Sequence, residues 1–217
     1  MSLLSKMLSA HRERRAAAAD DARDAFWAWF RENTAFLETY AEDTPGVVGE
    51  IGERLNAVDP RLAFELGRAD DGVYEFIVSA DGIREVFPEV VALVKAAPAV
   101  PGWRIVAFRP RKPGSLGRTV RYGPVELGAD ALWYRASDQA DRVALTLCVE
   151  GRDEDGARAM LGPIFLLLDA TLGEYDVTTR IGAIEFAACP AQPAVAGLRP
   201  ISDLAREVDA RFDPVPA

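Results

Sequence analysis

The chain has 217 residues, of which 49% are hydrophobic and 27% charged, and its formal net charge is −9 at pH 7. This composition is that of a folded globular protein, and the length suits one large domain or two small ones. An acidic surface repels nucleic acid and anionic membranes, and no apolar run approaches the ~20 residues of a membrane span. We therefore expect a cytoplasmic protein whose partner is neither nucleic acid nor a membrane.

Histidine and cysteine usage limits the chemistry. His11 is the one histidine, and it lies near the N-terminus, ahead of any predicted core. Histidine is the commonest general base and metal ligand near neutral pH, so His-based triads and Cys/His zinc sites are excluded, while carboxylate, Lys, Tyr or Ser chemistry stays open. Cys148 and Cys189 lie in apolar, strand-like surroundings, which favours buried reduced thiols over a disulfide. We predict no catalytic residue, no metal site and no cofactor.

Residues 1–60 are predicted to form an N-terminal helical arm. The segment 13–41 is rich in Ala, Glu and Arg, and its aromatic residues recur at helical spacing. Such an apolar face is typical of a core, with a partner groove or a dimer contact as the alternative. The face comprises Phe26, Trp27, Trp29, Phe30, Phe36, Leu37 and Tyr40. Pro45 and Gly46 end this helix, and a second helix follows over residues 47–56.

Residues 61–128 are predicted to form a first ββαβ unit. Two short runs of β-type residues flank Asp71 and Gly72, which are typical of a hairpin turn. A helix over residues 83–97 follows, and then a strand that begins at Trp103.

Residues 129–189 are predicted to form a second ββαβ unit. With a shift of 70 residues, Leu62 aligns with Leu132 and Val73 with Val143. The identities are few, and the repeated order of hairpin, helix and strand is the stronger indication. A helix over residues 154–170 and a last strand over 173–186 complete this unit. The tail, 190–217, carries a short helix around 202–212.

We therefore predict one globular α+β domain of ferredoxin-like type. Two ββαβ pseudo-repeats contribute to one mixed or antiparallel sheet, and their crossover helices cover one of its faces. The N-terminal helical arm packs on or beside this sheet and is the natural cover for its other face.

The last strands of the two units suggest a site. Strand alternation places Arg104 and Arg180 in equivalent positions on the second face, with Gly182 leaving room beside one of them. Two guanidinium groups there could hold a carboxylate or phosphate by bidentate hydrogen bonds. The alternative is that each arginine pairs with an acid, such as Asp176, Glu75 or Glu65. The candidate ligand-binding residues are Trp103, Arg104, Tyr175, Asp176, Thr178 and Arg180.

A basic segment separates the two predicted units. Its glycines and prolines indicate a mobile loop, which could bind a phosphate backbone or an acidic partner. It lacks the interleaved aromatic residues that stack on bases, so a solvated loop is the simpler interpretation. Its basic residues are Arg109, Arg111, Lys112, Arg118 and Arg121.

The sequence as a whole predicts a non-catalytic binding or interaction module, with a protein partner or a second copy of the chain as its ligand. The alternative is a sensor or enzyme for a small anionic ligand that uses the arginine-lined sheet face. An open cleft with convergent polar groups would favour this alternative, and a broad apolar patch would favour the interaction module.

Overall fold

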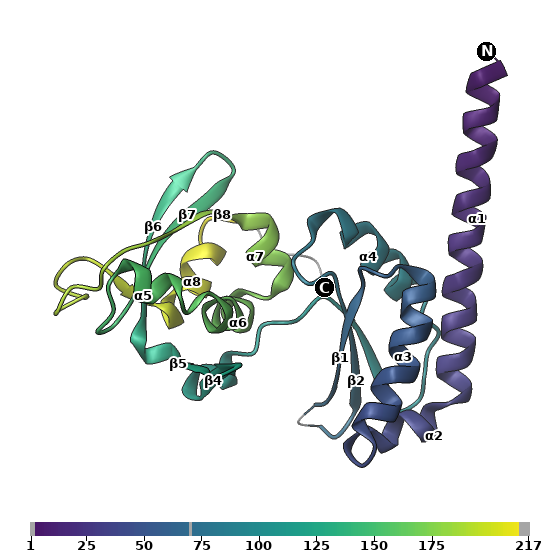
Figure 1. Cartoon of the computed structure of the whole chain (residues 1–217), viewed down its shortest axis with the longest axis horizontal. Helices are drawn as coiled ribbons and strands as arrows, with labels where there is room; N and C mark the ends of the chain where they lie inside the picture. Colours follow the sequence, from purple (N-terminus) through teal and green to yellow (C-terminus); the bar gives the residue numbers. More distant parts are fainter. Residues whose placement is uncertain (1–2, 70, 213–217) are drawn as a thin grey trace. The chain divides into compact units, whose positions relative to one another are not determined.

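The computed structural model describes residues 3–69 and 71–212, except for the side chains of residues 3–8, 10–13, 15, 16 and 115. His11 is among the side chains outside this description. The fold is α+β, and the chain divides into two compact units, Met1–Ala107 and Phe108–Ala217 (Figure 1). Each unit has a mixed sheet of its own. The prediction that both halves share one sheet is therefore wrong.

Helices open unit 1. They are α1 (Leu3–Glu32), α2 (Thr34–Leu37), the 3-10 turn η1 (Glu38–Ala41) and α3 (Thr44–Val58). The helix predicted over residues 13–41 begins earlier and breaks at Asn33, whose side-chain amide donates to the Trp29 carbonyl at 2.8 Å. Asp43 caps α3 by accepting a hydrogen bond from the Gly46 N–H at 3.1 Å.

The sheet of unit 1 has the strand order β1-β2-β3. Its elements are β1 (Ala63–Arg68), β2 (Tyr74–Ser79), the 3-10 turn η2 (Arg84–Val86), α4 (Phe87–Lys95) and β3 (Trp103–Ala107). β1 and β2 are antiparallel and form the predicted hairpin, with Gly72 in its turn at a φ of 82°. β2 and β3 are parallel, so α4 is the crossover helix between them.

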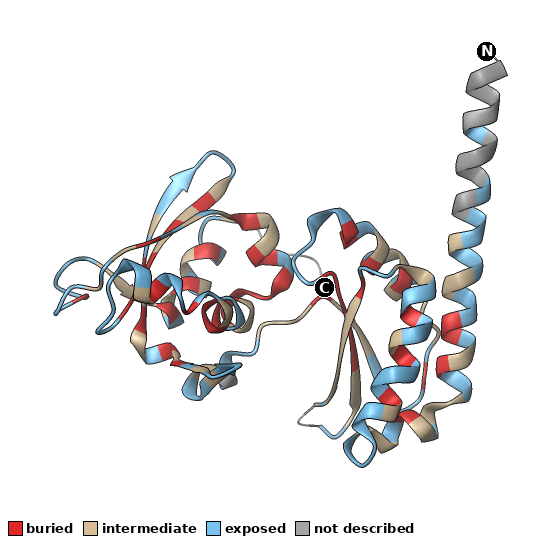
Figure 2. Ribbon diagram, viewed as in Figure 1, coloured by how far each residue is buried: buried red, intermediate tan, exposed pale blue. Residues whose placement is uncertain are grey.

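The core of unit 1 is aromatic. The rings of Phe26 and Phe30 on α1 lie 5.8 and 5.1 Å from the ring of Phe76, and all three residues are buried. Figure 2 shows buried residues, in red, in the part of α1 that lies beside α3. Phe30 also contacts Trp103, with the ring centroids 5.0 Å apart. The predicted aromatic face is thus core in part, since Phe26, Trp27, Phe30 and Leu37 are buried. Its other residues, Trp29, Phe36 and Tyr40, are half-buried. The aromatic face covers the sheet face of Phe76 and Trp103, so the prediction that the arm covers the face of Arg104 is wrong.

Unit 2 contains a two-stranded hairpin and a four-stranded sheet of order β8-β7-β6-β9. Its strands are β4 (Thr119–Tyr122), β5 (Val125–Gly128), β6 (Leu132–Gln139), β7 (Arg142–Val149), β8 (Ile181–Phe186) and β9 (Arg199–Pro200). Its helices are α5 (Glu154–Arg158), α6 (Leu161–Leu172), α7 (Glu174–Arg180) and α8 (Leu204–Asp209), with 3-10 turns η3 (Pro113–Gly117), η4 (Ala129–Ala131) and η5 (Ile201–Asp203). β7 is antiparallel to β6 and parallel to β8, and β9 pairs with the other side of β6.

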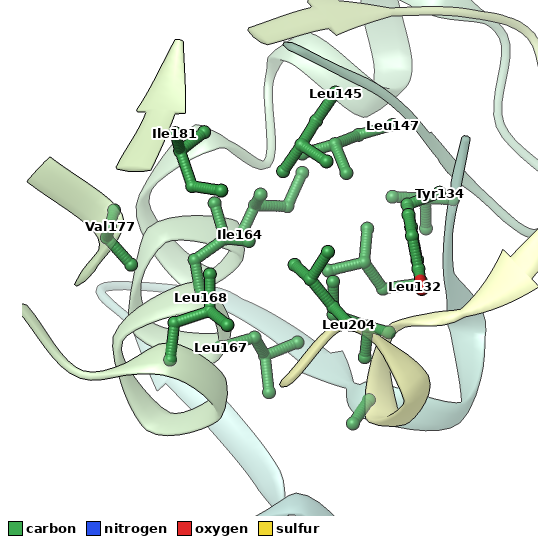
Figure 3. Close-up of a cluster of buried hydrophobic side chains, with 14 of the residues drawn as sticks. Leu132, Tyr134, Leu145, Leu147, Ile164, Leu167, Leu168, Val177, Ile181 and Leu204 are labelled. Atoms are coloured by element: carbon green, nitrogen blue, oxygen red, sulfur yellow. The ribbon is translucent and has the colours of Figure 1, made fainter. Parts of the chain in front are cut away.

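Helix α6 is the centre of the unit 2 core. Ile164, Leu167 and Leu168 are fully buried on it, and Figure 3 shows them facing Leu145 of β7 and Leu204 of α8. Helix α8 lies within the tail segment for which a short helix was predicted, and it closes this core.

The segment predicted as the last strand, residues 173–186, is a strand only over its second part, β8. Residues Glu174–Arg180 form helix α7, so the strand prediction is wrong there. Gly173 ends α6 with a φ of 81°, a conformation that favours glycine and turns the chain into α7. The N–H of Glu174 then donates to the Arg109 carbonyl at 3.0 Å. Glu174 and Asp176 in the first turn of α7 interact favourably with the positive end of the helix dipole.

Candidate functional site

Arg104 is an ion-paired residue on the surface of unit 1. It lies on β3 with a side chain 47% exposed, and it donates to Glu75 at 2.9 Å and to Asp71 at 2.8 Å. A backbone hydrogen bond from Val73 and then the bond from Arg104 lower the pKa of Asp71 below its usual value. Arg104 is thus paired with acids, as in the alternative interpretation. Of the acids named there, Glu75 is a partner, whereas the second partner, Asp71, was not predicted.

Arg180 is the last residue of α7 in unit 2, and its side chain is 11% exposed. Its Nε lies 3.0 Å from Oδ1 of Asp176, and its guanidinium lies 5.4 Å from the ring centroid of Phe212. Because Arg180 is helical and Arg104 is in a strand of the other unit, the predicted equivalence of the two arginines on one sheet is wrong.

The space predicted beside Gly182 is filled by a side chain. A Cβ added to this glycine would meet the side-chain oxygen of Gln139. The same oxygen accepts a hydrogen bond from the Ala183 N–H at 2.7 Å. The small residue makes room for the Gln139 amide rather than for a ligand.

The remaining candidate ligand-binding residues are divided between the two units. Trp103 is a core residue of unit 1, stacked on Tyr74 with the ring centroids 5.0 Å apart. Tyr175 and Thr178 are on α7 in unit 2, where the Tyr175 ring meets the edge of Phe108 at 5.4 Å.

Arg111, from the predicted mobile loop, joins three helices of unit 2. Its Nε donates to the Leu172 carbonyl of α6 at 2.9 Å, and its terminal nitrogens bond Asp176 of α7 at 2.6 Å and Asp209 of α8 at 2.8 and 2.7 Å. The bonds from Arg111 lower the pKa of the Asp209 carboxyl below its usual value. The Arg111 guanidinium therefore has a structural role, because its hydrogen bonds connect α6, α7 and α8.

The prediction of a mobile, solvated loop is therefore wrong for residues 109–112. The Arg109 N–H donates to a carboxylate oxygen of Glu174 at 3.1 Å, and the Lys112 N–H donates to the Ala170 carbonyl at 2.8 Å. Farther along, Arg121 is ion-paired with Glu126 across the β4–β5 hairpin, and Arg118 is exposed.

An apolar groove in unit 1 is the candidate site that the sequence analysis missed. It has a volume of about 460 Å³ and lies between α3 and strand β1. Its lining residues are Tyr40, Thr44, Val48, Leu62, Ala63, Phe64 and Leu66. Val48 is 42% exposed on α3, and this apolar residue on the outer side of a helix was the one available signal.

Within the described part of unit 1, strand β1 has no strand neighbour on the side away from β2, and we call this side its free edge. It stands at the end of the strand order and pairs with β2 on one side. The Ala69 N–H donates to the Val73 carbonyl at 2.8 Å, which identifies this pair as hydrogen-bonded. In an antiparallel ladder, residues whose backbone groups bond to the partner strand alternate with residues whose backbone groups point away from it. Counting back from Ala69 in steps of two, Gly67 and Glu65 bond to β2. The backbone N–H and C=O groups of Phe64 and Leu66 therefore point away from β2, to the free edge.

The described side chains do not contain a cluster of three or more His, Cys, Asp or Glu residues that could hold a metal ion. Among the helices in the described part of the chain, none has the length and apolar character to cross a membrane.

Comparison of the chain with protein-family models, with curated proteins and with solved structures finds no match.

Proposed function

We propose that this protein is a non-catalytic binding module that takes an extended segment of a partner protein at the free edge of β1. The observation that carries the proposal is the outward-pointing backbone of Phe64 and Leu66 beside an apolar groove lined by their side chains. Addition of a strand to an exposed sheet edge is a recurrent mode of peptide recognition, in which main-chain bonds give affinity and pockets for alternate side chains give specificity.

Strand β1 has only some of the features that usually protect a sheet edge. It is short and carries the charged residues Glu65 and Arg68, but its six residues, AFELGR, contain no proline and no lysine. Its register with β2 is continuous, without a bulge. Because an incompletely protected edge can pair with other chains, this edge next to apolar surface supports a binding role.

The geometry also specifies the chemistry of the partner. A strand added to β1 would exchange N–H···O bonds with Phe64 and Leu66, and its side chains would alternate between the two faces of the sheet. Those on the groove side would contact Val48 of α3 and Tyr40 of η1. We therefore propose a partner segment with apolar residues at every second position.

The anionic-ligand alternative has less support. Each of its main arginines, Arg104 and Arg180, has carboxylate partners within its own unit. An anion would have to displace these acids, at the expense of charge-assisted hydrogen bonds. A cytoplasmic location stays part of our proposal and is supported by the two free cysteines, Cys148 and Cys189.

We further propose that the two units arose by duplication of a ββαβ element of ferredoxin-like type. The support is their common succession of an antiparallel pair, a helical crossover and a parallel third strand, in the orders β1-β2-β3 and β6-β7-β8.

The test is selection of peptides from a displayed random library on the purified chain, followed by affinity measurement with the enriched, fluorescently labelled peptides. Val48→Lys places a charge in the groove wall and is expected to weaken binding at least tenfold. Val91→Lys is the matched control, because Val91 is a valine of similar exposure, 48%, on α4.

The proposal is supported if the enriched peptides have alternating apolar residues and bind more weakly to Val48→Lys but equally well to Val91→Lys and the wild type. Failure to enrich any sequence, or equal binding to both variants, would overturn it. A chain dimer that Val48→Lys dissociates would also overturn it, because a second copy would then be the occupant of the edge. Light scattering separates that outcome from peptide binding.

A further inference from the structure

Two cysteines of unit 2 lie side by side although 41 residues separate them in the chain. The Sγ atoms of Cys148 and Cys189 are 2.7 Å apart. Cys148 is on β7 and only 1% exposed, whereas Cys189 is half-buried in the segment that follows β8. The pair therefore has one enclosed thiol and one that solvent can reach.

Backbone hydrogen bonds hold the two cysteines in this position. The Ala187 N–H donates to the Leu147 carbonyl at 3.0 Å, so the chain continues beside β7 after β8 has ended. The Cys189 N–H then donates to the Arg152 carbonyl at 3.1 Å. The first bond attaches the segment before Cys189 to Leu147, the neighbour of Cys148. The second attaches Cys189 itself to the turn that follows β7. The proximity of the thiols is thus set by the main chain.

We infer that Cys148 and Cys189 are a redox-active pair that forms an intramolecular disulfide on reaction with a small-molecule disulfide such as oxidised glutathione. In the first step the Cys189 thiolate attacks one sulfur of the oxidant, forms a mixed disulfide and releases one small thiolate. In the second step the sulfur of Cys148 attacks Sγ of Cys189, the mixed disulfide bond breaks, and the Cys148 proton passes to the second small thiolate as it leaves. Two protein thiols are oxidised and one small disulfide is reduced to two thiols.

The order of the two steps follows from exposure. Cys189 can meet an oxidant, whereas Cys148 is enclosed. Burial first, and then the hydrogen bond with Cys189, raises the pKa of the Cys148 thiol to about 12. A thiol with a high pKa reacts poorly with reagents in solution. Cys148 is therefore suited to the intramolecular step, in which proximity compensates for its small thiolate fraction.

The disulfide would close a large loop within unit 2. Helices α5, α6 and α7 and strand β8 all lie between the two cysteines. A cross-link over 41 residues restricts the unfolded chain, and we expect it to raise the melting temperature of unit 2 by on the order of 10 °C.

The experiment incubates the folded full-length chain with oxidised glutathione and follows free thiols, intact mass and melting temperature. The wild type is expected to lose both thiols without keeping glutathione and to melt at the higher temperature, reversibly on reduction. Cys148→Ala is expected to keep glutathione on Cys189. Cys189→Ala is expected to stay unmodified at Cys148. Both variants should show no rise in melting temperature.

Circular dichroism checks that the variants fold, and the wild-type measurement stands on its own if one of them does not. Retention of both thiols by the wild type, a stable glutathione adduct on Cys189, or cross-linking between chains would each overturn the inference. Because the pair lies in unit 2, this result is independent of peptide binding at β1.

Discussion

Arg111 and Asp209 face each other through two hydrogen bonds of 2.8 and 2.7 Å, although they are 98 positions apart in the sequence. Two such bonds side by side are the strongest common form of arginine–carboxylate pairing. The same guanidinium bonds Asp176 at 2.6 Å, so one side chain satisfies acids on two helices.

Arg111→Ala is expected to destabilise unit 2 by about 2 kcal/mol, because it leaves the 6% exposed Asp176 without one of its two cationic partners. Urea unfolding followed by circular dichroism measures the effect. Arg118→Ala is the control, since Arg118 is exposed in the same segment, and its effect should stay within about 0.5 kcal/mol. Equal effects of the two substitutions would contradict the role assigned to Arg111.

The pairing of Asp209 predicts a pH dependence. The folded-state pKa of this carboxyl lies below the ordinary value of 3.8, so its contribution to stability is complete above pH 3.8 and is lost as pH falls toward the folded-state pKa. We expect Asp209→Asn to be less stable than the wild type at pH 7, and the difference to shrink below about pH 4. Unfolding curves across this range measure it. A difference that stays constant down to pH 2.5 would contradict the assignment, and Asp141→Asn, in an exposed turn, serves as the control.

Proline substitutions test the direction of the backbone groups in β1. Leu66→Pro removes an N–H that points to the free edge, whereas Glu65→Pro removes one that bonds to β2. Glu65→Pro is expected to destabilise unit 1 by about 1–3 kcal/mol more than Leu66→Pro. Thermal melts give the comparison. Leu66→Pro should also abolish binding of the peptides selected at the groove, and the reverse order of stabilities would show that the edge has been assigned wrongly.

Local patterns in the sequence predicted much of the fold. The helical spacing of Phe26, Trp27 and Phe30 indicated a core face, and all three are buried. The hairpin turn at Gly72 and strand β8 were also predicted, because a positive φ at glycine and a run of β-type residues are local signals. These features depend on residues that are neighbours along the chain.

Helix α7 escaped prediction because its sequence, EYDVTTR, contains three β-branched residues that favour strands. The helix depends instead on the turn at Gly173 and on contacts with Arg109 and Arg111, more than 60 residues earlier in the chain. Tertiary contacts of this kind override local propensity, and a single sequence does not display them.

The candidate site was hidden for the same reason. The groove combines Tyr40 of η1, Val48 of α3 and Phe64 of β1, which become neighbours only after unit 1 has folded. The prediction of an arginine site for an anion has less support for a different reason. The residue types were suitable for an anion, but each guanidinium already has carboxylates within reach.

The distance in sequence between Arg111 and Asp209 also bears on synthesis. Translation proceeds at about 5–20 residues per second, so Asp209, 98 positions after Arg111, is added ~5–20 s later. During that interval the Arg111 guanidinium is without one of its acids, and helix α8 is missing from the core that Leu204 completes. Unit 2 can therefore reach its final packing only after α8 has been made, whereas all the elements of unit 1 have been made by the time Ala107 is added.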